Sequence, residues 1–129
     1  MEIQFKVSRT KNGEQEVSAK ALDLAERKIR NLKKYFGDPR RELGVQVYVE
    51  LGKDSEAHHT GPFWRAQIHL DDKGERFNAE ATADRIEVAV VAAVSELERE
   101  LRSRKVQRES MLKRGGTALK SLLRGFGSR

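Results

Sequence analysis

The sequence contains no cysteine and only two prolines. Without cysteine, the chain has neither a disulfide framework nor a thiolate metal site, which agrees with a reducing compartment. No apolar run approaches the ~18 residues of a membrane span, and the opening segment alternates polar with apolar residues instead of forming the apolar block of a signal peptide. We therefore expect a soluble, cytoplasmic protein, and 129 residues suit one compact domain with an appendage.

Recognisable catalytic motifs are also missing. The glycines form neither a phosphate loop nor a dinucleotide-binding pattern, and the histidines lack the helical spacing of a zinc protease. The best candidate ligands for a metal ion are Asp54, Glu56, His58, His59 and His69. Because adjacent histidines in an extended segment point to opposite sides, an ordinary surface loop is the favoured interpretation. We expect no enzyme, no cofactor, no metal and no small-molecule substrate.

Positive charge is concentrated at one end of the sequence. Residues 1–101 contain 17 Lys and Arg against 19 Asp and Glu, a net charge of −2, whereas residues 102–129 contain nine Lys and Arg against one Glu, a net charge of +8. A basic segment beside a nearly neutral body is the pattern expected of a nucleic-acid-binding protein, because cations that neutralise phosphates release condensed counterions. A solubilising disordered tail is the alternative interpretation.

Hydrophobic periodicity predicts the order strand, helix, three strands, helix. The alternating segments that indicate strands are residues 2–8, 45–51, 64–70 and 77–83. Short connections between the last three strands favour antiparallel pairing, and two helices with one apolar side each belong on the same face of the sheet. We expect an α+β two-layer sandwich, β-α-β-β-β-α, with a four-stranded sheet and two helices on one face. Double-stranded-RNA-binding domains share this order, so the fold alone leaves the function open.

The first predicted helix covers residues 19–36 and begins after Ser18, whose hydroxyl is suited to cap it. Its apolar face comprises Leu22, Ala25, Ile29, Leu32 and Phe36. Arg27 and Lys34 lie on the opposite face, and Lys28 lies on a flank. Each of these cations is ordinary for a solvated helix face. Together the cations of this helix outnumber its two acids, which makes contact with an anionic partner an equally good interpretation.

The second predicted helix, residues 85–105, organises the rest of the chain. It has one apolar stripe at helical spacing: Ile86, Val90, Ala93, Leu97 and Leu101. Apolar residues do not continue this stripe, so we expect no further cover from the body. The cations that follow are Arg102, Arg104, Lys105 and Arg108. A helix that is anchored in a core at one end and cationic at the other is suited to present charge to an anionic partner.

Residues 106–129 are predicted to form a flexible basic tail on a folded domain of residues 1–105. Gly115 and Gly116 are expected to interrupt the helix. The apolar residues that follow them form at most a short helix, which is marginal in water without a partner. We therefore expect the tail to become ordered only on binding.

Exposed aromatic side chains are too few to predict base stacking. Trp64 is in phase with the apolar residues of its strand and favours the core, whereas Tyr48 is out of phase and faces away from the helices. Without a cluster of exposed aromatic residues, recognition of RNA backbone and shape is favoured over the reading of single-stranded bases.

The chain contains two informative segments: VSAKALDLAERKIRNLKKYF, residues 17–36, and RFNAEATADRIEVAVVAAVSELERELRSRK, residues 76–105. The first resembles the first helix of the ribosome hibernation promoting factor family, whose members are also called ribosome-associated inhibitors or sigma-54 modulation proteins. The second resembles the last strand and second helix of that family, and the order of elements agrees over about residues 1–105. The resemblance implies a translation inhibitor of the stress response that binds ribosomal RNA of the small ribosomal subunit, in the channel used by messenger and transfer RNA, and silences idle ribosomes.

The resemblance also implies which cations contact RNA. Lys28, Arg99 and Lys105 match basic positions of the family, whereas Asn31 and Ser103 stand where members often have lysine. Combined with the charge pattern, the expected RNA-binding residues are Lys28, Arg27, Lys34, Arg99, Arg102, Arg104, Lys105 and Arg108. Long members of the family add a C-terminal dimerisation domain, for which the residues after Lys105 are too few. The resemblance is therefore to a short form that is a monomer when free.

Two other functions remain open at the level of sequence. A generic double-stranded-RNA-binding module would have the same order of elements. A protein-interaction domain that regulates a transcription factor would agree with the older family name. Binding to small ribosomal subunits without a preference for free duplex RNA distinguishes ribosome silencing from both.

Overall fold

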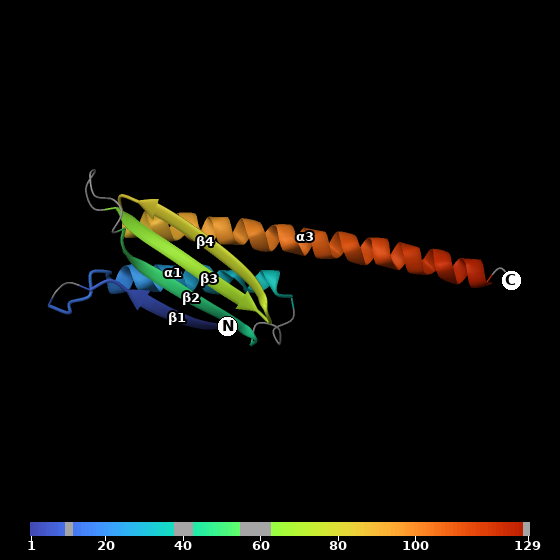
Figure 1. Cartoon of the computed structure of the whole chain (residues 1–129), viewed down its shortest axis with the longest axis horizontal. Coiled ribbons are helices and arrows are strands. Elements are labelled where there is room, and N and C mark those ends of the chain that lie inside the picture. Colours follow the sequence, from blue (N-terminus) through green and yellow to red (C-terminus); the bar gives the residue numbers. More distant parts are fainter. Residues whose placement is uncertain (10–11, 38–42, 55–62, 128–129) are drawn as a thin grey trace.

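The protein has two layers, a four-stranded sheet and a pair of helices that cover one of its faces (Figure 1). The computed structural model describes residues 1–9, 12–37, 43–54 and 63–127, with side chains up to residue 113. In chain order the elements are β1 (Glu2–Val7), α1 (Ala19–Arg30), the 3-10 helix η1 (Asn31–Tyr35), β2 (Val45–Lys53), β3 (Trp64–Asp72), β4 (Glu75–Ala83) and α3 (Ile86–Gly127). The predicted α+β sandwich and its β-α-β-β-β-α order are confirmed.

The strands lie in the sheet in the order β1-β2-β3-β4. β1 runs parallel to β2 because α1 returns the chain to the same end of the sheet, whereas β3 pairs antiparallel with both β2 and β4, as predicted. In the turn between β3 and β4, Lys73 and Gly74 have φ values of 53° and 93°. Such a left-handed pair matches the twist of a hairpin, and Asp71 Oδ1 accepts a hydrogen bond of 2.8 Å from the Gly74 amide.

The core lies between the sheet and the helices. The stripe predicted for the second helix is buried in full: Ile86, Val90, Ala93, Leu97 and Leu101. The inward residues of β2 are buried as well: Val45, Val47, Val49 and Leu51. Small buried residues let α3 approach the sheet closely, since Ala66 and Ala79 lie on the strands and Ala89 lies on the helix. Burial of these apolar side chains is the main source of stability for the domain.

α1 begins with the predicted cap, in which the Ser18 hydroxyl accepts a hydrogen bond of 3.1 Å from the Ala21 amide. The helix then tightens into η1, although the sequence predicted one continuous α-helix up to Phe36. Leu22, which was assigned to the apolar face, is only half-buried, because Ala21 occupies the position against the core. Gly37 follows η1 with a φ of 74°, and a left-handed residue there ends the helical segment as predicted.

α3 is 42 residues long and continues well beyond the sheet and α1 (Figure 1). It runs through Gly115 and Gly116 to Gly127, so the predicted helix break at the two glycines is wrong. A glycine costs a helix interior only about 1 kcal/mol relative to alanine, which weakens a helix without ending it. The flexibility of residues 106–129 stays a prediction. Despite the length of α3, none of the described helices has the apolar stretch needed to cross a membrane.

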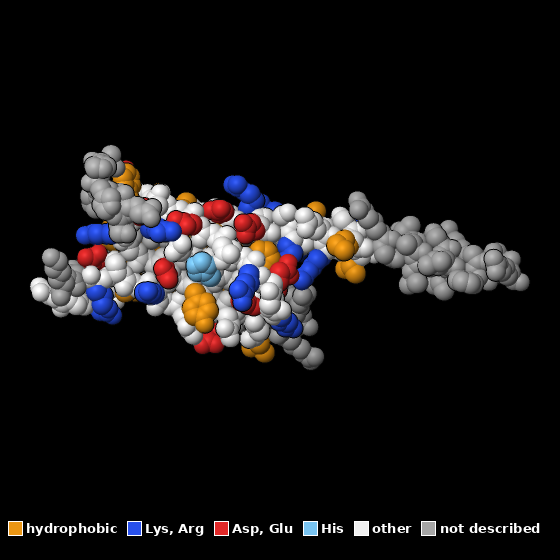
Figure 2. Space-filling model, viewed as in Figure 1, with side chains coloured by type: hydrophobic (Ala, Val, Ile, Leu, Met, Phe, Trp, Pro, Cys, Tyr) orange, Lys and Arg blue, Asp and Glu red, His pale blue; other side chains and the backbone are white. Residues whose placement is uncertain are grey.

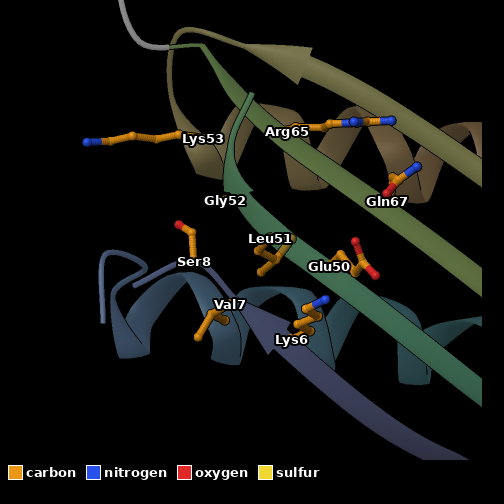
Figure 3. Close-up of a pocket in the computed structure, with 9 residues that line it drawn as sticks. All are labelled: Lys6, Val7, Ser8, Glu50, Leu51, Gly52, Lys53, Arg65 and Gln67. Atoms are coloured by element: carbon orange, nitrogen blue, oxygen red, sulfur yellow. The ribbon is translucent and has the colours of Figure 1, made fainter. Parts of the chain in front are cut away.

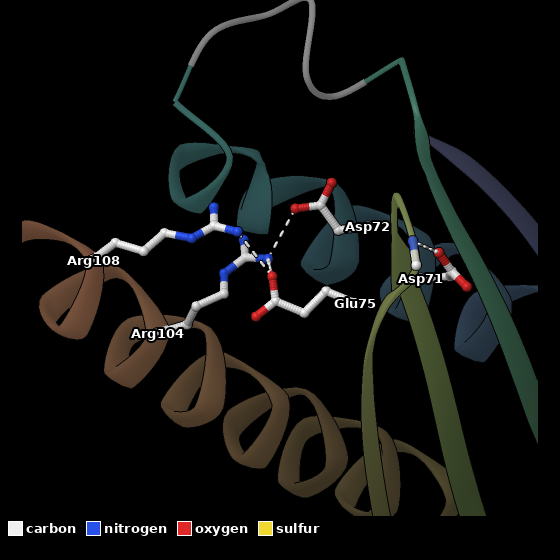
Figure 4. Close-up of polar contacts among 6 residues, drawn as sticks. Asp71, Asp72, Glu75, Arg104 and Arg108 are labelled. Atoms are coloured by element: carbon white, nitrogen blue, oxygen red, sulfur yellow. Dashed lines mark hydrogen bonds and ion pairs between the residues drawn. The ribbon is translucent and has the colours of Figure 1, made fainter. Parts of the chain in front are cut away.

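Arg104 also differs from its sequence-based prediction. The sequence predicts an exposed cation, but the side chain is only 7% exposed, because the turn between β3 and β4 covers one more turn of α3 than expected. Arg104 Nη1 lies 2.8 Å from Asp72 Oδ2 and 3.2 Å from Glu75 Oε2 (Figure 4). The guanidinium also lies 5.5 Å from the ring centre of Phe36 and 4.8 Å from that of Phe77.

Arg108 extends this network toward solvent. Its Nη2 lies 2.8 Å from Glu75 Oε2, and its side chain is 42% exposed. Asp72 is only 4% exposed, which makes its pairing with Arg104 a buried ion pair. We call Asp72, Glu75, Arg104 and Arg108 the Arg104 anchor. Its charges sum to zero, and it ties α3 to the β3–β4 turn at the place where the helix leaves the body.

Removing the side chain of Arg104 is expected to destabilise the fold much more than removing that of Arg108. In Arg104→Ala the Asp72 carboxylate stays buried without its partner, which typically costs about 3–5 kcal/mol. Arg108→Ala breaks a half-exposed pair and is expected to cost no more than about 1 kcal/mol. Urea unfolding of both variants beside the wild type measures these changes in the free energy of unfolding.

A third variant separates charge from shape. Asp72→Leu combined with Arg104→Met removes both buried charges and keeps much of the side-chain volume. It is expected to regain most of the stability lost in Arg104→Ala, because apolar residues often replace a buried ion pair without loss. If Arg104→Ala and Arg108→Ala lower the free energy of unfolding equally, Arg104 does not have the structural role that the Arg104 anchor assigns to it.

Candidate nucleic-acid interface

The other cations predicted from the sequence lie on the helix layer. Arg27 is exposed in the last turn of α1, and Lys28 beside it is half-buried. Lys34 is exposed on η1. The exposed cations of α3 that were predicted are Arg99, Arg102 and Lys105. Lys33, a further exposed cation on η1, was not selected, although its place in the Lys33-Lys34 pair is a visible signal.

Four of the eight predicted cations form two groups of ion pairs. Lys34 and Arg102 meet at Glu98, where η1 and α3 lie side by side. Arg104 and Arg108 turn instead toward the β3–β4 turn, where the acids of the Arg104 anchor neutralise them. The cause is angular, since residues two apart on a helix are separated by about 200° around its axis. Arg104 therefore leaves the candidate interface, and Arg108 keeps only its exposed part for a partner.

Four side chains form the first group, which we call the Glu98 cluster: Lys34, Tyr35, Glu98 and Arg102. Tyr35 Oη donates a hydrogen bond of 2.8 Å to Glu98 Oε1. Arg102 Nη2 donates one of 3.0 Å to the same oxygen, and Lys34 Nζ lies 3.9 Å from it. Lys34 Nζ also lies 5.4 Å from the centre of the Tyr35 ring. The cluster holds two predicted RNA-binding cations at one place.

The Glu98 cluster carries a net positive charge at neutral pH. The hydrogen bond from Tyr35, followed by the charges of Lys34 and Arg102, lowers the pKa of Glu98 below its ordinary value, although partial burial opposes this shift. The Tyr35 hydroxyl and then Glu98 raise the pKa of Arg102. One carboxylate therefore orients two cations, and it fixes their positions while it cancels half of their charge.

Exposed cations also line up along α3. Arg99, Arg102 and Lys105 follow one another at intervals of three residues, and residues three apart are neighbours on a helix surface. We call these three residues the α3 cation row. The row continues from the Glu98 cluster toward the part of α3 that leaves the body. Guanidinium and ammonium groups in such a row are suited to donate to phosphate oxygens of a nucleic-acid backbone.

Of the five candidate metal ligands, the structure describes Asp54 and His69. Within the described ranges, no three His, Asp or Glu side chains converge to hold a metal ion. Of the candidate ligands, Glu56, His58 and His59 lie outside the described residues. His69 Nδ1 lies 2.5 Å from Asn78 Oδ1 on the open face of the sheet.

A shallow depression at the end of β1 and β2 is lined by Lys6, Lys53 and Arg65, among others (Figure 3). Lys53 and Arg65 point away from each other and pair with glutamates at 3.9 and 2.7 Å. Gly52 is required beside this depression, because a Cβ atom there would lie 2.8 Å from the Cβ atom of Ser8. The cations do not converge as a phosphate site would require, so the helix layer remains the candidate interface.

The lowered pKa of Glu98 predicts a pH-dependent contribution to stability. A carboxylate whose pKa is lower in the folded than in the unfolded protein stabilises the fold fully above its unfolded pKa, here near the ordinary value of 4.5, and this contribution is lost as the pH falls through the folded pKa. The wild type is therefore expected to be more stable than Glu98→Gln at neutral pH and equally stable well below pH 4.5. Urea unfolding across this pH range measures the difference.

Glu96→Gln is the matched control for this experiment, because Glu96 is an exposed glutamate on the same helix. Its stability is expected to stay close to that of the wild type at every pH. A stability difference for Glu98→Gln that is the same at neutral and acid pH would show that Glu98 does not act through its charge.

Comparisons with known proteins bear on the identity of the chain. Residues 10–109 match the family model described as "Sigma 54 modulation protein / S30EA ribosomal protein". A search of curated proteins found no match. Among solved structures, the N-terminal domain of Thermus thermophilus Protein Y has a TM-score of 0.57 and 23% sequence identity, over 78% of this chain and 96% of that one. A ribosomal subunit interface protein from Coxiella burnetii has a TM-score of 0.60 and 17% identity, over 82% of this chain and 99% of that one.

The two kinds of similarity carry different weight. Both solved structures are less than 25% identical to this chain, so they establish the shared fold alone. The family match establishes more than the fold, because it spans well over half of the chain. The matched residues include the Glu98 cluster, the α3 cation row and the helices of the body. This chain therefore belongs to the Sigma 54 modulation protein / S30EA ribosomal protein family.

Proposed function

We propose that this protein binds the small ribosomal subunit through ribosomal RNA, in the channel used by messenger and transfer RNA, and silences translation on idle ribosomes. The observation that carries the proposal is the joining of exposed cations from η1 and α3 on one surface by the Glu98 cluster. Membership of a family described as S30EA ribosomal protein supports it, as does the fold shared with a ribosomal subunit interface protein. Such a protein acts in the cytoplasm and during stress, as a monomer without a cofactor.

The physical basis of binding is contact with RNA phosphates. Arg102 is held by Glu98 and Tyr35 before any partner arrives, so it loses little side-chain freedom on binding. Phosphate contacts position a protein without reading sequence, which suits a protein that meets the same folded RNA on every ribosome. A domain held in the channel in this way excludes messenger and transfer RNA by occupying their space.

Reversing two charges of the α3 cation row is expected to weaken ribosome binding without unfolding the protein. Arg99→Glu combined with Arg102→Glu changes exposed side chains, so the free energy of unfolding is expected to stay within about 1 kcal/mol of the wild type. Cosedimentation with purified small subunits is expected to show an affinity at least roughly tenfold lower, since a hydrogen bond to a charged group is worth about 1.5–3 kcal/mol. Loss of two phosphate contacts also makes the log–log salt dependence shallower by about 1.4 to 1.8.

Lys20→Glu combined with Arg85→Glu is the matched control. Both residues are exposed and stand at or next to the beginning of a helix, so the change in net charge is the same but the Glu98 cluster and the α3 cation row are untouched. This variant is expected to bind as the wild type does. If both double variants weaken ribosome binding equally, the loss of affinity comes from the change in net charge and not from these particular residues. Efficient competition by free duplex RNA would favour a generic duplex-binding module instead.

The part of α3 beyond Lys105 is a second basic element that we assign to the same partner. Residues 106–127 of the helix extend about 33 Å at 1.5 Å per residue. Three apolar residues of this segment are exposed: Val106, Met111 and Leu112, at 57%, 70% and 75%. A helix that leaves the body with both basic and apolar residues uncovered is suited to contact RNA beyond the reach of the domain itself.

Ending the chain after Ser110 tests this element, because the truncated protein keeps the Arg104 anchor. Stability is expected to change by no more than about 1 kcal/mol, since the first side chains removed are exposed. Affinity for small subunits is expected to fall and its salt dependence to become shallower, because cations are lost. In hydrogen exchange of the whole protein, residues 111–127 are expected to be protected when the protein is bound to the ribosome and unprotected when it is free. Unchanged affinity after truncation would exclude a role for the extension.

A further inference from the structure

The face of the sheet opposite the helices carries a row of two aromatic residues and one amide residue that no part of the proposed function uses. The register of the strands places Tyr48 beside His69, and His69 beside Asn78, so that three adjacent strands present one line of side chains. All three residues are exposed, and Tyr48 keeps 47% of its surface accessible. We call Tyr48, His69 and Asn78 the Tyr48 row. In the sequence these residues are far apart, and Tyr48 alone was too little to predict base stacking.

The Tyr48 row lines an open depression of about 340 Å³. This size lies in the range of about 300–1,000 Å³ that is typical of sites for small ligands or parts of ligands. Asp71 and Arg76 form the side of the depression nearest the β3–β4 turn. Arg76 is 80% exposed, and its Nε lies 3.6 Å from Asp71 Oδ2, so its guanidinium stands at the rim and in contact with solvent.

The groups in this depression are those that recognise a nucleobase. Tyrosine and histidine rings are stacking surfaces for unpaired bases, and here they lie side by side on β2 and β3. His69 Nδ1 lies 2.5 Å from Asn78 Oδ1, and the tautomer that donates this hydrogen bond from Nδ1 leaves Nε2 as an acceptor. The Asn78 amide nitrogen supplies donors, and Arg76 supplies a cation for an adjoining phosphate. A stacking surface, an acceptor, donors and a cation therefore meet at one place.

The charge of the whole face limits the kind of ligand. Its outward charged residues are Glu2, Lys6, Glu50, Arg65, Asp71, Arg76 and Glu80. Four acids against three cations give no general attraction for RNA. In Figure 2 the acidic side chains (red) and the basic side chains (blue) are interspersed over this face. A long strand held by its phosphates is therefore disfavoured. A single base, inserted at the Tyr48 row while the helix layer supplies the affinity, fits both the charge and the size of the depression.

We propose that the Tyr48 row is a stacking site for one unpaired base of an RNA strand. This inference rests on the proposed function, because the helix layer brings the protein to RNA and the row then contacts a base on the opposite side. The protein thereby touches RNA on both faces, by phosphate contacts on the helices and by a base contact on the sheet. Recognition of one splayed base adds selectivity for a particular place on a folded RNA, which phosphate contacts alone do not provide.

The test uses the whole chain and a short, fluorescently labelled, single-stranded oligoadenylate, with anisotropy as the readout. Tyr48→Leu keeps an apolar side chain of the strand but removes the ring, and is expected to lower the affinity for the oligoadenylate about 5- to 100-fold. Tyr48→Phe keeps the ring and is expected to bind within about twofold of the wild type. Gln46→Ala, an exposed neighbour on the same strand and face, is the matched control and is expected to have no effect.

The same variants on other RNAs and on ribosomes separate the outcomes. Binding of a duplex RNA is expected to be equal for Tyr48→Leu and wild type, because paired bases are not available for stacking. Equal oligoadenylate affinity for Tyr48→Leu and wild type overturns the base site, whatever happens on ribosomes. If Tyr48→Leu then still weakens binding to small subunits, the row contacts a ribosomal protein. A further outcome is that Arg99→Glu with Arg102→Glu loses ribosome binding, while Tyr48→Leu binds both ribosomes and the oligoadenylate as the wild type does. This outcome supports the proposed function and overturns the base site.

Discussion

Two helices share one face of a four-stranded sheet, and this constraint determines where the Glu98 cluster and the Tyr48 row lie. α3 fits beside α1 because small buried residues on β3, β4 and α3 allow a close approach. With both helices on one side, the end of η1 comes within hydrogen-bond distance of α3, and the Glu98 cluster forms there. None of the described helices lies on the opposite face of the sheet, where the register of the strands assembles the Tyr48 row. Both surfaces are consequences of one packing arrangement.

The fold was predictable from the sequence because it depends on local periodicity, whereas the site depends on long-range partners. The stripe from Ile86 to Leu101 is visible as a pattern, and so are the alternating strands. Arg102 and Arg104 look alike in the sequence, yet one is exposed and the other is buried against Asp72, which lies 32 residues earlier. The apolar stripe through Leu97 and Leu101, continued by three residues, reaches Arg104 and would have predicted its burial. Because Arg104 is charged, the sequence analysis placed the end of the core before it.

Glu98 shows how the positioning of cations and their net charge are balanced at the proposed RNA-binding surface. An interface built from cations alone would attract phosphates more strongly, but its long side chains would be disordered and would lose freedom on binding. Glu98 ties Lys34 and Arg102 to one oxygen and lowers the net charge of the group. In the Arg104 anchor the balance differs, because neutralisation is complete and the cations serve the attachment of a helix instead. Cations of similar sequence context therefore have two roles within one helix.

The order of the elements along the chain has a consequence for synthesis. α3 follows all four strands, so the inner face of the sheet has no complete cover until Leu101 has been added. Non-local contacts of this kind form late, and apolar surface that waits for them is prone to association with other chains. The nascent chain thus carries an incomplete core for most of its translation, and the final polar lock, Arg104 against Asp72, closes only after the last apolar residue of the stripe is in place. The fold of the body can therefore be completed only after this part of α3 has been synthesised.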